Sequence, residues 1–184
     1  MKKVKFLSTV VLATLLFTAC SKDDDNPEPV NEEEVLTTMT VTLTPQAGGT
    51  PIMLQTKDLD GDGPNAPEVT VSGNLTVGAI YNGVIVLLNE TVSPPENITE
   101  EVEEEAKDHQ FFYTIGSGLD VTTEPSNFDG DGNPLGTEFT LTATTASSGT
   151  LTFTLRHLPT KPNTGLGDAG GETDIAATFN VTVQ

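Results

Sequence analysis

Two short acidic runs hold the residues whose spacing has the clearest chemical meaning in this chain. The first run is Asp58-Leu59-Asp60-Gly61-Asp62-Gly63. Three alternating carboxylates can converge on one hard cation, and the glycine permits the sharp turn that follows them. This pattern is the first half of a calcium-binding loop. It makes Asp58, Asp60 and Asp62 candidate calcium ligands.

The second run is Asn127-Phe128-Asp129-Gly130-Asp131-Gly132, and Glu138 falls at the twelfth loop position. An EF-hand loop places its bidentate carboxylate at that position. Neither run is flanked by a helical pattern, so we expect loops between strands rather than EF-hands. The alternative is a pair of ordinary turns, because Asp and Gly are common turn residues. The candidate calcium ligands here are Asn127, Asp129, Asp131 and Glu138.

His109 and His157 are the only histidines. They could share a metal ion, but no His-x-His or His-x-x-x-His spacing supports this, and structural roles are the preferred interpretation. The sequence has no Gly-x-Ser-x-Gly motif, and its single cysteine, Cys20, is a predicted lipidation site rather than a catalytic nucleophile. We therefore predict a protein that is not an enzyme.

Period-two alternation governs most of the chain beyond residue 35. Met39-Thr40-Val41-Thr42-Leu43-Thr44 alternates apolar and polar residues, as a half-buried strand does. Similar runs are separated by glycine-rich turn signals, which include Asn82-Gly83 and Ser147-Ser148-Gly149. The predicted strands are 39–44, 52–55, 69–77, 80–92, 111–115, 119–122, 139–145, 151–155 and 175–183. The similarity of the two acidic runs also predicts equivalent loops at one end of the fold.

One segment has a helical pattern instead. Asn97 can cap a helix, Glu100 follows three residues later, and Ile98, Val102 and Ala106 repeat every four residues. We expect a short acidic helix here. The fold prediction is therefore all-β: an antiparallel, immunoglobulin-like β-sandwich of eight or nine strands with one short acidic helix.

The N-terminus predicts export and lipidation. A positive segment, an apolar run from Phe6 to Phe17 and a small residue before Cys20 form a secretory signal. The position of Cys20 resembles a bacterial lipobox, which implies that its thiol carries lipid. The acidic residues after it resemble a Bacteroidota export signal for the cell exterior. The predicted parts are a signal peptide (1–19), an acidic disordered tether (20–34) and a β-sandwich domain (35–184).

Charge excludes some partners. Removal of Lys2, Lys3 and Lys5 with the signal peptide leaves five basic residues against 27 acidic ones, a net charge near −22. Phosphate binding requires Lys and Arg, so nucleic acid is not an expected partner. The lipid anchor on Cys20 is the expected link to the membrane.

The whole mature chain resembles a family of small, uncharacterised surface lipoproteins of Bacteroidota. The likeness lies in four segments: 57–67, 100–113, 156–157 and 170–175. Some relatives carry the label "type 1 periplasmic binding fold", which implies alternating strands and helices in two lobes, whereas this sequence reads almost entirely as strands. The resemblance implies a location in the outer membrane, lipid-anchored and facing the cell exterior, and it implies no site residues.

The functional hypothesis is a non-enzymatic binding or accessory module, with calcium as its possible cofactor. One alternative is a structural subunit of an outer-membrane complex, docked to a protein partner. Another is a carrier of a small ligand such as a glycan or haem. The absence of Trp disfavours a carrier, but an apolar pocket lined by Phe111, Phe112 and Tyr113 would favour it.

Overall fold

A computed structural model describes residues 34–61 and 63–184. The predicted signal peptide, Cys20 and residues 20–33 of the predicted tether lie outside the described residues, as does Asp62. No helix in the described part of the chain is long and apolar enough to cross a membrane. Strands account for 49% of the described residues and helices for 7%, so the all-β prediction is confirmed.

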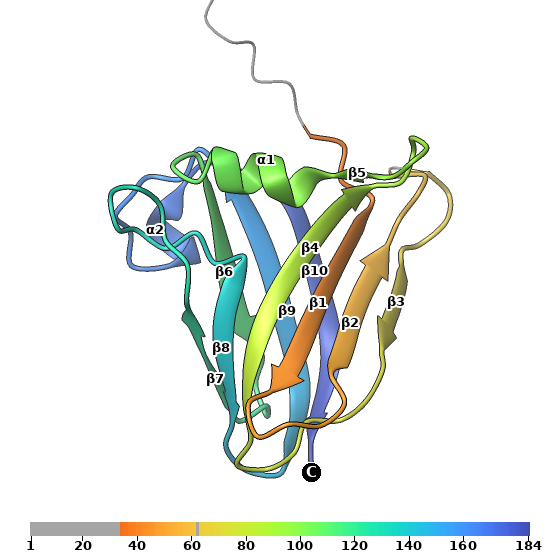
Figure 1. The fold of residues 1–184 in the computed structure, drawn as a ribbon, viewed down its shortest axis with the longest axis vertical. Coiled ribbons are helices and arrows are strands. Elements are labelled where there is room, and N and C mark those ends of the chain that lie inside the picture. Colours follow the sequence, from red (N-terminus) through yellow and green to blue (C-terminus); the bar gives the residue numbers. More distant parts are fainter. Residues whose placement is uncertain (1–33, 62) are drawn as a thin grey trace, which may run out of the picture. The chain divides into compact units, whose positions relative to one another are not determined.

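Two antiparallel sheets form a sandwich (Figure 1). The larger sheet has the order β3-β2-β1-β4-β8-β7, with β5 paired to β4, and the smaller sheet has the order β10-β9-β6. The strands of the larger sheet are β1 (Thr38–Pro45), β2 (Ile52–Lys57), β3 (Glu68–Val71), β4 (Ile80–Asn89), β5 (Glu96–Asn97), β7 (Val121–Pro125) and β8 (Glu138–Ala143). The remaining elements are β6 (His109–Ile115), β9 (Ser147–His157), β10 (Glu172–Val183) and the helices α1 (Ile98–Glu104) and α2 (Leu166–Ala169).

The core lies between the sheets and follows the predicted alternation. In β1, Met39, Val41 and Leu43 are fully buried, while the threonines between them are partly exposed. Aromatic rings cross the interior in a connected series, with centroid separations of 4.7 to 5.9 Å. Burial of such rings is a major source of folding free energy in a chain without disulfides. The series consists of Tyr113, Phe139, Phe153 and Phe179.

All nine predicted strands are present, and the two-residue β5 is the tenth among the described residues. The turn predicted at Asn82-Gly83 is wrong, because both residues lie inside β4. Gly83 serves close packing instead: a Cβ there would lie 2.3 Å from the Phe139 ring. Ser147-Ser148-Gly149 likewise lies inside β9 rather than forming a separate turn.

The acidic helix α1 is confirmed at Ile98–Glu104, and Asn97 caps it as predicted. The Asn97 side chain accepts a hydrogen bond from the Thr99 amide at 3.3 Å, and its amide donates to Glu100 Oε1 at 3.0 Å. Ile98 and Val102 are buried in the core. The helix therefore closes one end of the sandwich with its apolar stripe.

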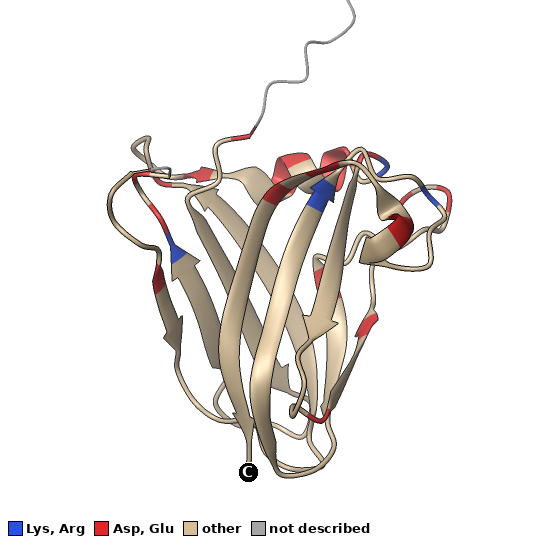
Figure 2. Ribbon diagram, turned by 180° about the vertical axis from the view of Figure 1, so that it is seen from behind, with Lys and Arg blue, Asp and Glu red and all other residues tan. Residues whose placement is uncertain are grey.

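Most of the charged residues of the described domain lie at this end, which we call the α1 end (Figure 2). The β2–β3 loop, which holds the first acidic run, and the β7–β8 loop, which holds the second, both lie there (Figure 1). Acidic residues are concentrated at the same end (Figure 2). The two acidic runs thus lie at one end of the sandwich, as their similarity predicts.

Candidate metal centre

His109 and His157 lie side by side on adjacent strands of the smaller sheet. His109 opens β6, His157 ends β9, and the two are direct partners in the antiparallel register. Their rings stack with centroids 4.8 Å apart and an interplanar angle of 19°. The His109 side chain is fully buried and that of His157 is 12% exposed. The register therefore joins two histidines that are 48 positions apart in the sequence.

A β-bulge directs Asp174 toward this pair. The register between β10 and β9 shifts between Thr173 and Ile175, so Asp174 is the extra residue of the bulge. Bulges redirect side chains in this way and are common beside functional sites. Asp174 Oδ1 lies 3.8 Å from His157 Nδ1, and Asp174 Oδ2 lies 3.9 Å from His109 Nε2. One carboxylate thus faces both rings.

Glu34 contributes a second carboxylate from the segment that precedes β1. Its Oε1 lies 3.3 Å from His109 Nε2, and the side chain is only 7% exposed. The sequence places Glu34 at the end of the acidic tether. In the folded domain its carboxylate instead packs against the smaller sheet.

A backbone carbonyl fixes the tautomer of His109. The ring Nδ1 lies 3.2 Å from the carbonyl oxygen of Glu105, which follows α1. A carbonyl oxygen can only accept, so Nδ1 carries the proton and donates it. Nε2, which faces Glu34 and Asp174, is then the nitrogen whose lone pair is available in the neutral ring. Metal-binding histidines are usually held in this manner.

The carboxylates of the cluster are poorly compensated. Burial raises the pKa of Asp174 to about 6, although the two histidines lower it in part. Burial also opposes protonation of His109, but Glu34, the Glu105 carbonyl and Asp174 outweigh this and raise its pKa. Glu34 Oε2 and Asp174 Oδ2 are buried without a hydrogen-bond partner among the described residues. Such buried oxygens call for a cation or a proton.

The spacing of the donor atoms suits a small divalent ion. A tetrahedral site with bonds of about 2.0–2.1 Å has donor atoms roughly 3.3–3.4 Å apart. The observed separations are 3.3 Å between Glu34 and His109 and 3.8 to 3.9 Å between Asp174 and the two histidines, close to this value. His109, His157 and Asp174 present donor atoms within 4.8 Å of one another, as do Glu34, Glu105 and His109. A cavity of about 130 Å³ adjoins the cluster and is lined by Glu34, His157, Glu172, Thr173 and Asp174.

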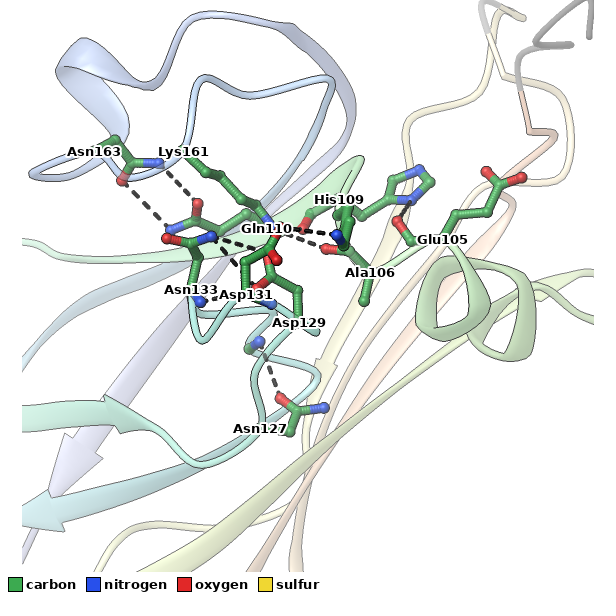
Figure 3. Close-up of polar contacts among 12 residues, drawn as sticks. Glu105, Ala106, His109, Gln110, Asn127, Asp129, Asp131, Asn133, Lys161 and Asn163 are labelled. Carbon is green, nitrogen blue, oxygen red and sulfur yellow. Dashed lines mark hydrogen bonds and ion pairs between the residues drawn. The ribbon is translucent and has the colours of Figure 1, made fainter.

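The second acidic run has its own internal cation (Figure 3). Asp129 is buried, and its Oδ2 lies 3.2 Å from Lys161 Nζ. Its Oδ1 accepts hydrogen bonds from the amides of Asp131 and Asn133, both at 2.9 Å. Burial alone would raise the pKa of Asp129, but these hydrogen bonds, with that from Lys161, lower it to about 2.

Lys161 is equally well held. Its ammonium donates to the carbonyls of Ala106 at 2.7 Å and His109 at 2.6 Å, just beyond the end of α1 (Figure 3). Cations stabilise the negative end of a helix dipole, and α1 has no basic residue in its own last turn. Burial nevertheless lowers the pKa of Lys161, so Asp129 offsets only part of the desolvation of the ammonium.

The other predicted ligands of this run have structural partners. Asn127 Oδ1 accepts from the amides of Gly136 at 3.0 Å and Glu138 at 3.1 Å, which closes the loop. Asp131 forms an exposed ion pair with Lys107 at 2.8 Å, and Glu138 is exposed. A calcium ion beside Asp129 would have to displace the Lys161 ammonium. Calcium binding at this run stays a prediction.

In the first acidic run, Asp60 is exposed and Asp58 is partly exposed. Asp58 Oδ1 accepts from the amide of Gly61 at 2.9 Å, and Asp60 Oδ2 accepts from the Asn65 side chain at 2.6 Å. That second hydrogen bond lowers the pKa of Asp60. A shallow cavity of about 250 Å³ lies between the two aspartates and Asn65. Calcium binding here also stays a prediction.

A further cavity of about 330 Å³ lies beside the aromatic segment of β6. Phe111, Phe112 and Tyr113 line it, together with an amide pair in which Asn163 Nδ2 donates to Gln110 Oε1 at 2.8 Å. In the sequence analysis, an apolar pocket lined by these three aromatic residues would favour the role of a small-ligand carrier.

Sequence reasoning missed the arrangement of the four-residue cluster. His109 and His157 have no motif spacing, and the bulge that directs Asp174 depends on pairing with β9. One signal was available for Asp174: β9 and β10 are consecutive strands, and consecutive strands often pair, which brings the start of β10 to the end of β9. No sequence signal distinguishes Glu34 from its acidic neighbours.

Comparison of the chain with protein-family models, with curated proteins and with solved structures found no match. The case for a function therefore rests on the site.

Proposed function

We propose that this chain is a non-enzymatic surface lipoprotein module that binds one divalent transition-metal ion. The ligands are Glu34, His109, His157 and Asp174. The single observation that carries the proposal is the convergence of two histidines and two carboxylates whose side chains are at most 14% exposed, with two carboxylate oxygens that lack hydrogen-bond partners among the described residues. Isolated buried charges are strongly unfavourable, so such a cluster is stable only with protons or a cation.

The donor set selects the class of ion. Calcium and magnesium prefer oxygen ligands, whereas imidazole nitrogen suits zinc, copper, iron and nickel. Two imidazoles and two carboxylates match zinc well, and zinc sites of this kind are commonly tetrahedral. No described lysine or arginine pairs with Glu34 or Asp174 within salt-bridge distance. Arg156 lies nearby but donates to the carbonyls of Gly170 and Gly171.

The wider setting of the module belongs to the same proposal. Lipid on Cys20 would anchor it in the outer membrane, facing the cell exterior, and the sandwich would act as an immunoglobulin-like module. What supports this is the N-terminal sequence pattern and the β-sandwich. Docking to an outer-membrane protein as a structural subunit remains the alternative role.

Zinc titration of the protein purified from membranes in mild detergent tests the proposal. Isothermal titration calorimetry should give one site per chain, and His157→Gln should weaken binding at least tenfold, since ligand losses of this kind typically have such effects. His157 is the variant of choice because its ring is less buried than that of His109.

Asp60→Asn combined with Asp131→Asn is the matched control. These substitutions remove two carboxylates at the same end of the sandwich and leave the cluster intact, so zinc affinity should not change. The proposal fails if the wild type binds no zinc, or if the control variant loses as much affinity as His157→Gln.

The aromatic cavity supports a second candidate function, the binding of a small ligand. Its volume lies at the lower end of the range for ligand pockets, and it combines an aromatic wall with the Gln110–Asn163 amide pair. Gln110→Ala should abolish binding of any glycan that a glycan array detects. A hit that Gln110→Ala leaves unchanged would remove this cavity from consideration.

A further inference from the structure

Glu34 differs from the other three ligands in where it comes from. His109, His157 and Asp174 lie on β6, β9 and β10, which together make the smaller sheet. Glu34 precedes β1, which belongs to the larger sheet, and it lies on the side of the domain's sequence that leads back to Cys20. An ion bound by all four would join the entry segment of the domain to the opposite sheet.

The backbone near Glu34 is secured only from Thr37 onward. The Thr37 amide donates to the Leu88 carbonyl at 3.0 Å, and the Thr37 carbonyl accepts from the Asp58 amide at 2.7 Å. The Thr37 hydroxyl accepts from the Glu90 amide at 2.8 Å. These hydrogen bonds tie Thr37 to β4 and to the end of β2 without any contribution from the cluster.

Residues 34–36 have no comparable attachment. No backbone hydrogen bond joins Glu34 or Val35 to another described residue, and Val35 is 53% exposed. Leu36 packs partly against the core. The polar attachment of this segment is the Glu34 carboxylate, whose Oε1 lies 3.3 Å from His109 Nε2 and whose Oε2 has no hydrogen-bond partner among the described residues.

We infer that the metal site is a clasp: a bound divalent transition-metal ion fastens Glu34, and with it the entry segment, to the smaller sheet. This inference rests on the proposed metal binding and adds a consequence to it. With the ion, the domain is held from Glu34; without it, the hydrogen-bonded attachment begins at Thr37, and Glu34 keeps only its contact with His109. The released length is three residues, or up to about 10 Å of extended chain. The ion thereby sets how closely the domain is tied to its anchor.

The clasp also explains why a carboxylate of the entry segment is buried at all. A carboxylate gains nothing by leaving water unless a cation or a hydrogen-bond donor receives it. In the described domain the available partner is the His109 ring, which is neutral in the form that ligates a metal. A shared metal ion compensates Glu34 and Asp174 at the same time.

A spin label at position 35 tests the clasp directly. Val35→Cys places a thiol on an exposed side chain next to Glu34, and the only native cysteine is Cys20, the predicted lipid attachment point. Electron paramagnetic resonance spectra of the full chain, recorded in detergent at neutral pH, should show a mobile label with EDTA and a several-fold slower label with zinc. Val77→Cys, which is also exposed, is the matched control and should give the same spectrum in both conditions.

Glu34→Ala in the Val35→Cys background separates the clasp from metal binding itself. This variant should still bind zinc through His109, His157 and Asp174, with reduced affinity, but zinc should no longer slow the label. If zinc binds the parent variant and the label stays mobile, the clasp is overturned while the metal site stands. If Glu34→Ala shows the same slowing as its parent, the clasp is equally overturned. If calorimetry detects no zinc binding at all, the proposed function fails first.

Discussion

Asp129 and Asp174 are two carboxylates at the same end of one sandwich with side chains only 1% and 14% exposed, yet their pKa values move in opposite directions. The pKa of Asp129 falls to about 2, because hydrogen bonds from its own loop and from Lys161 outweigh burial. The pKa of Asp174 rises to about 6, because burial outweighs the nearby histidines. The first carboxylate has a complete set of partners within the chain and the second does not. This difference indicates that Asp129 belongs to a structural ion pair, whereas Asp174 can still accept a cation.

The same comparison revises the order in which the candidate sites rank. The second acidic run has the calcium-like motif, but a lysine ammonium lies against its central aspartate. The histidine cluster has no motif, but its carboxylates lack an internal ammonium among the described residues. Buried carboxylate oxygens without hydrogen-bond partners among the described residues, rather than sequence spacing, indicate the site.

The largest effect on stability is expected when the buried ion pair between Asp129 and Lys161 is broken. Lys161→Met should lower the free energy of unfolding by about 3–5 kcal/mol, because it leaves Asp129 buried without its counter-ion. Urea unfolding at neutral pH measures this. Asp131→Asn, which breaks the exposed pair with Lys107, is the control and should have a far smaller effect, because exposed ion pairs contribute little to stability. Equal effects from both variants would mean that burial of the Asp129–Lys161 pair has no energetic consequence.

A smaller effect, opposite in sign, is expected at Asp174 in the metal-free protein. Its pKa in the folded state, about 6, lies above its ordinary value of 3.8, so the folded state binds the proton more tightly. The ionised carboxylate therefore destabilises the fold above pH 6, and acidification relieves this. Asp174→Asn should raise the free energy of unfolding at pH 7.5 by about 1–3 kcal/mol and have almost no effect near pH 4.

Urea unfolding of the EDTA-treated protein across this pH range measures the effect. Asp129 supplies the contrast, because its stabilisation is complete above pH 4 and is lost as the pH falls toward 2. With saturating zinc the sign for Asp174→Asn should reverse, since a ligand is then lost. A destabilising effect of Asp174→Asn in both conditions would indicate that Asp174 is already satisfied without a metal.

The smallest effect is expected from calcium. Millimolar calcium should stabilise the protein only slightly, because Asp60 of the first run is exposed and Asp129 of the second run is already paired with Lys161. Thermal unfolding with EDTA and then with calcium measures this, and Asp60→Asn should remove whatever shift appears. A shift of many degrees that Asp60→Asn abolishes would establish the first run as a true calcium site.

Much of the fold could be predicted from the sequence because local patterns control it. The alternation around Met39–Thr44 predicts β1, and the Asn97 cap with the Ile98–Val102 spacing predicts α1. The turn signal at Asn82-Gly83 misled because glycine serves two purposes. At Gly83 its value is the missing side chain, which makes room for the Phe139 ring from the neighbouring strand.

The sequence by itself determined the strands, the acidic helix and the strong negative charge, and it predicts export and lipidation. These follow from periodicity and composition, which are local properties of the chain. Tertiary structure decided which charged groups meet. Lys161 reaches Asp129 across 32 positions, and strand register with one bulge brings His109, His157 and Asp174 together. Ion pairs and metal ligands depend on distances of a few ångströms between remote residues, and only the folded backbone sets those distances.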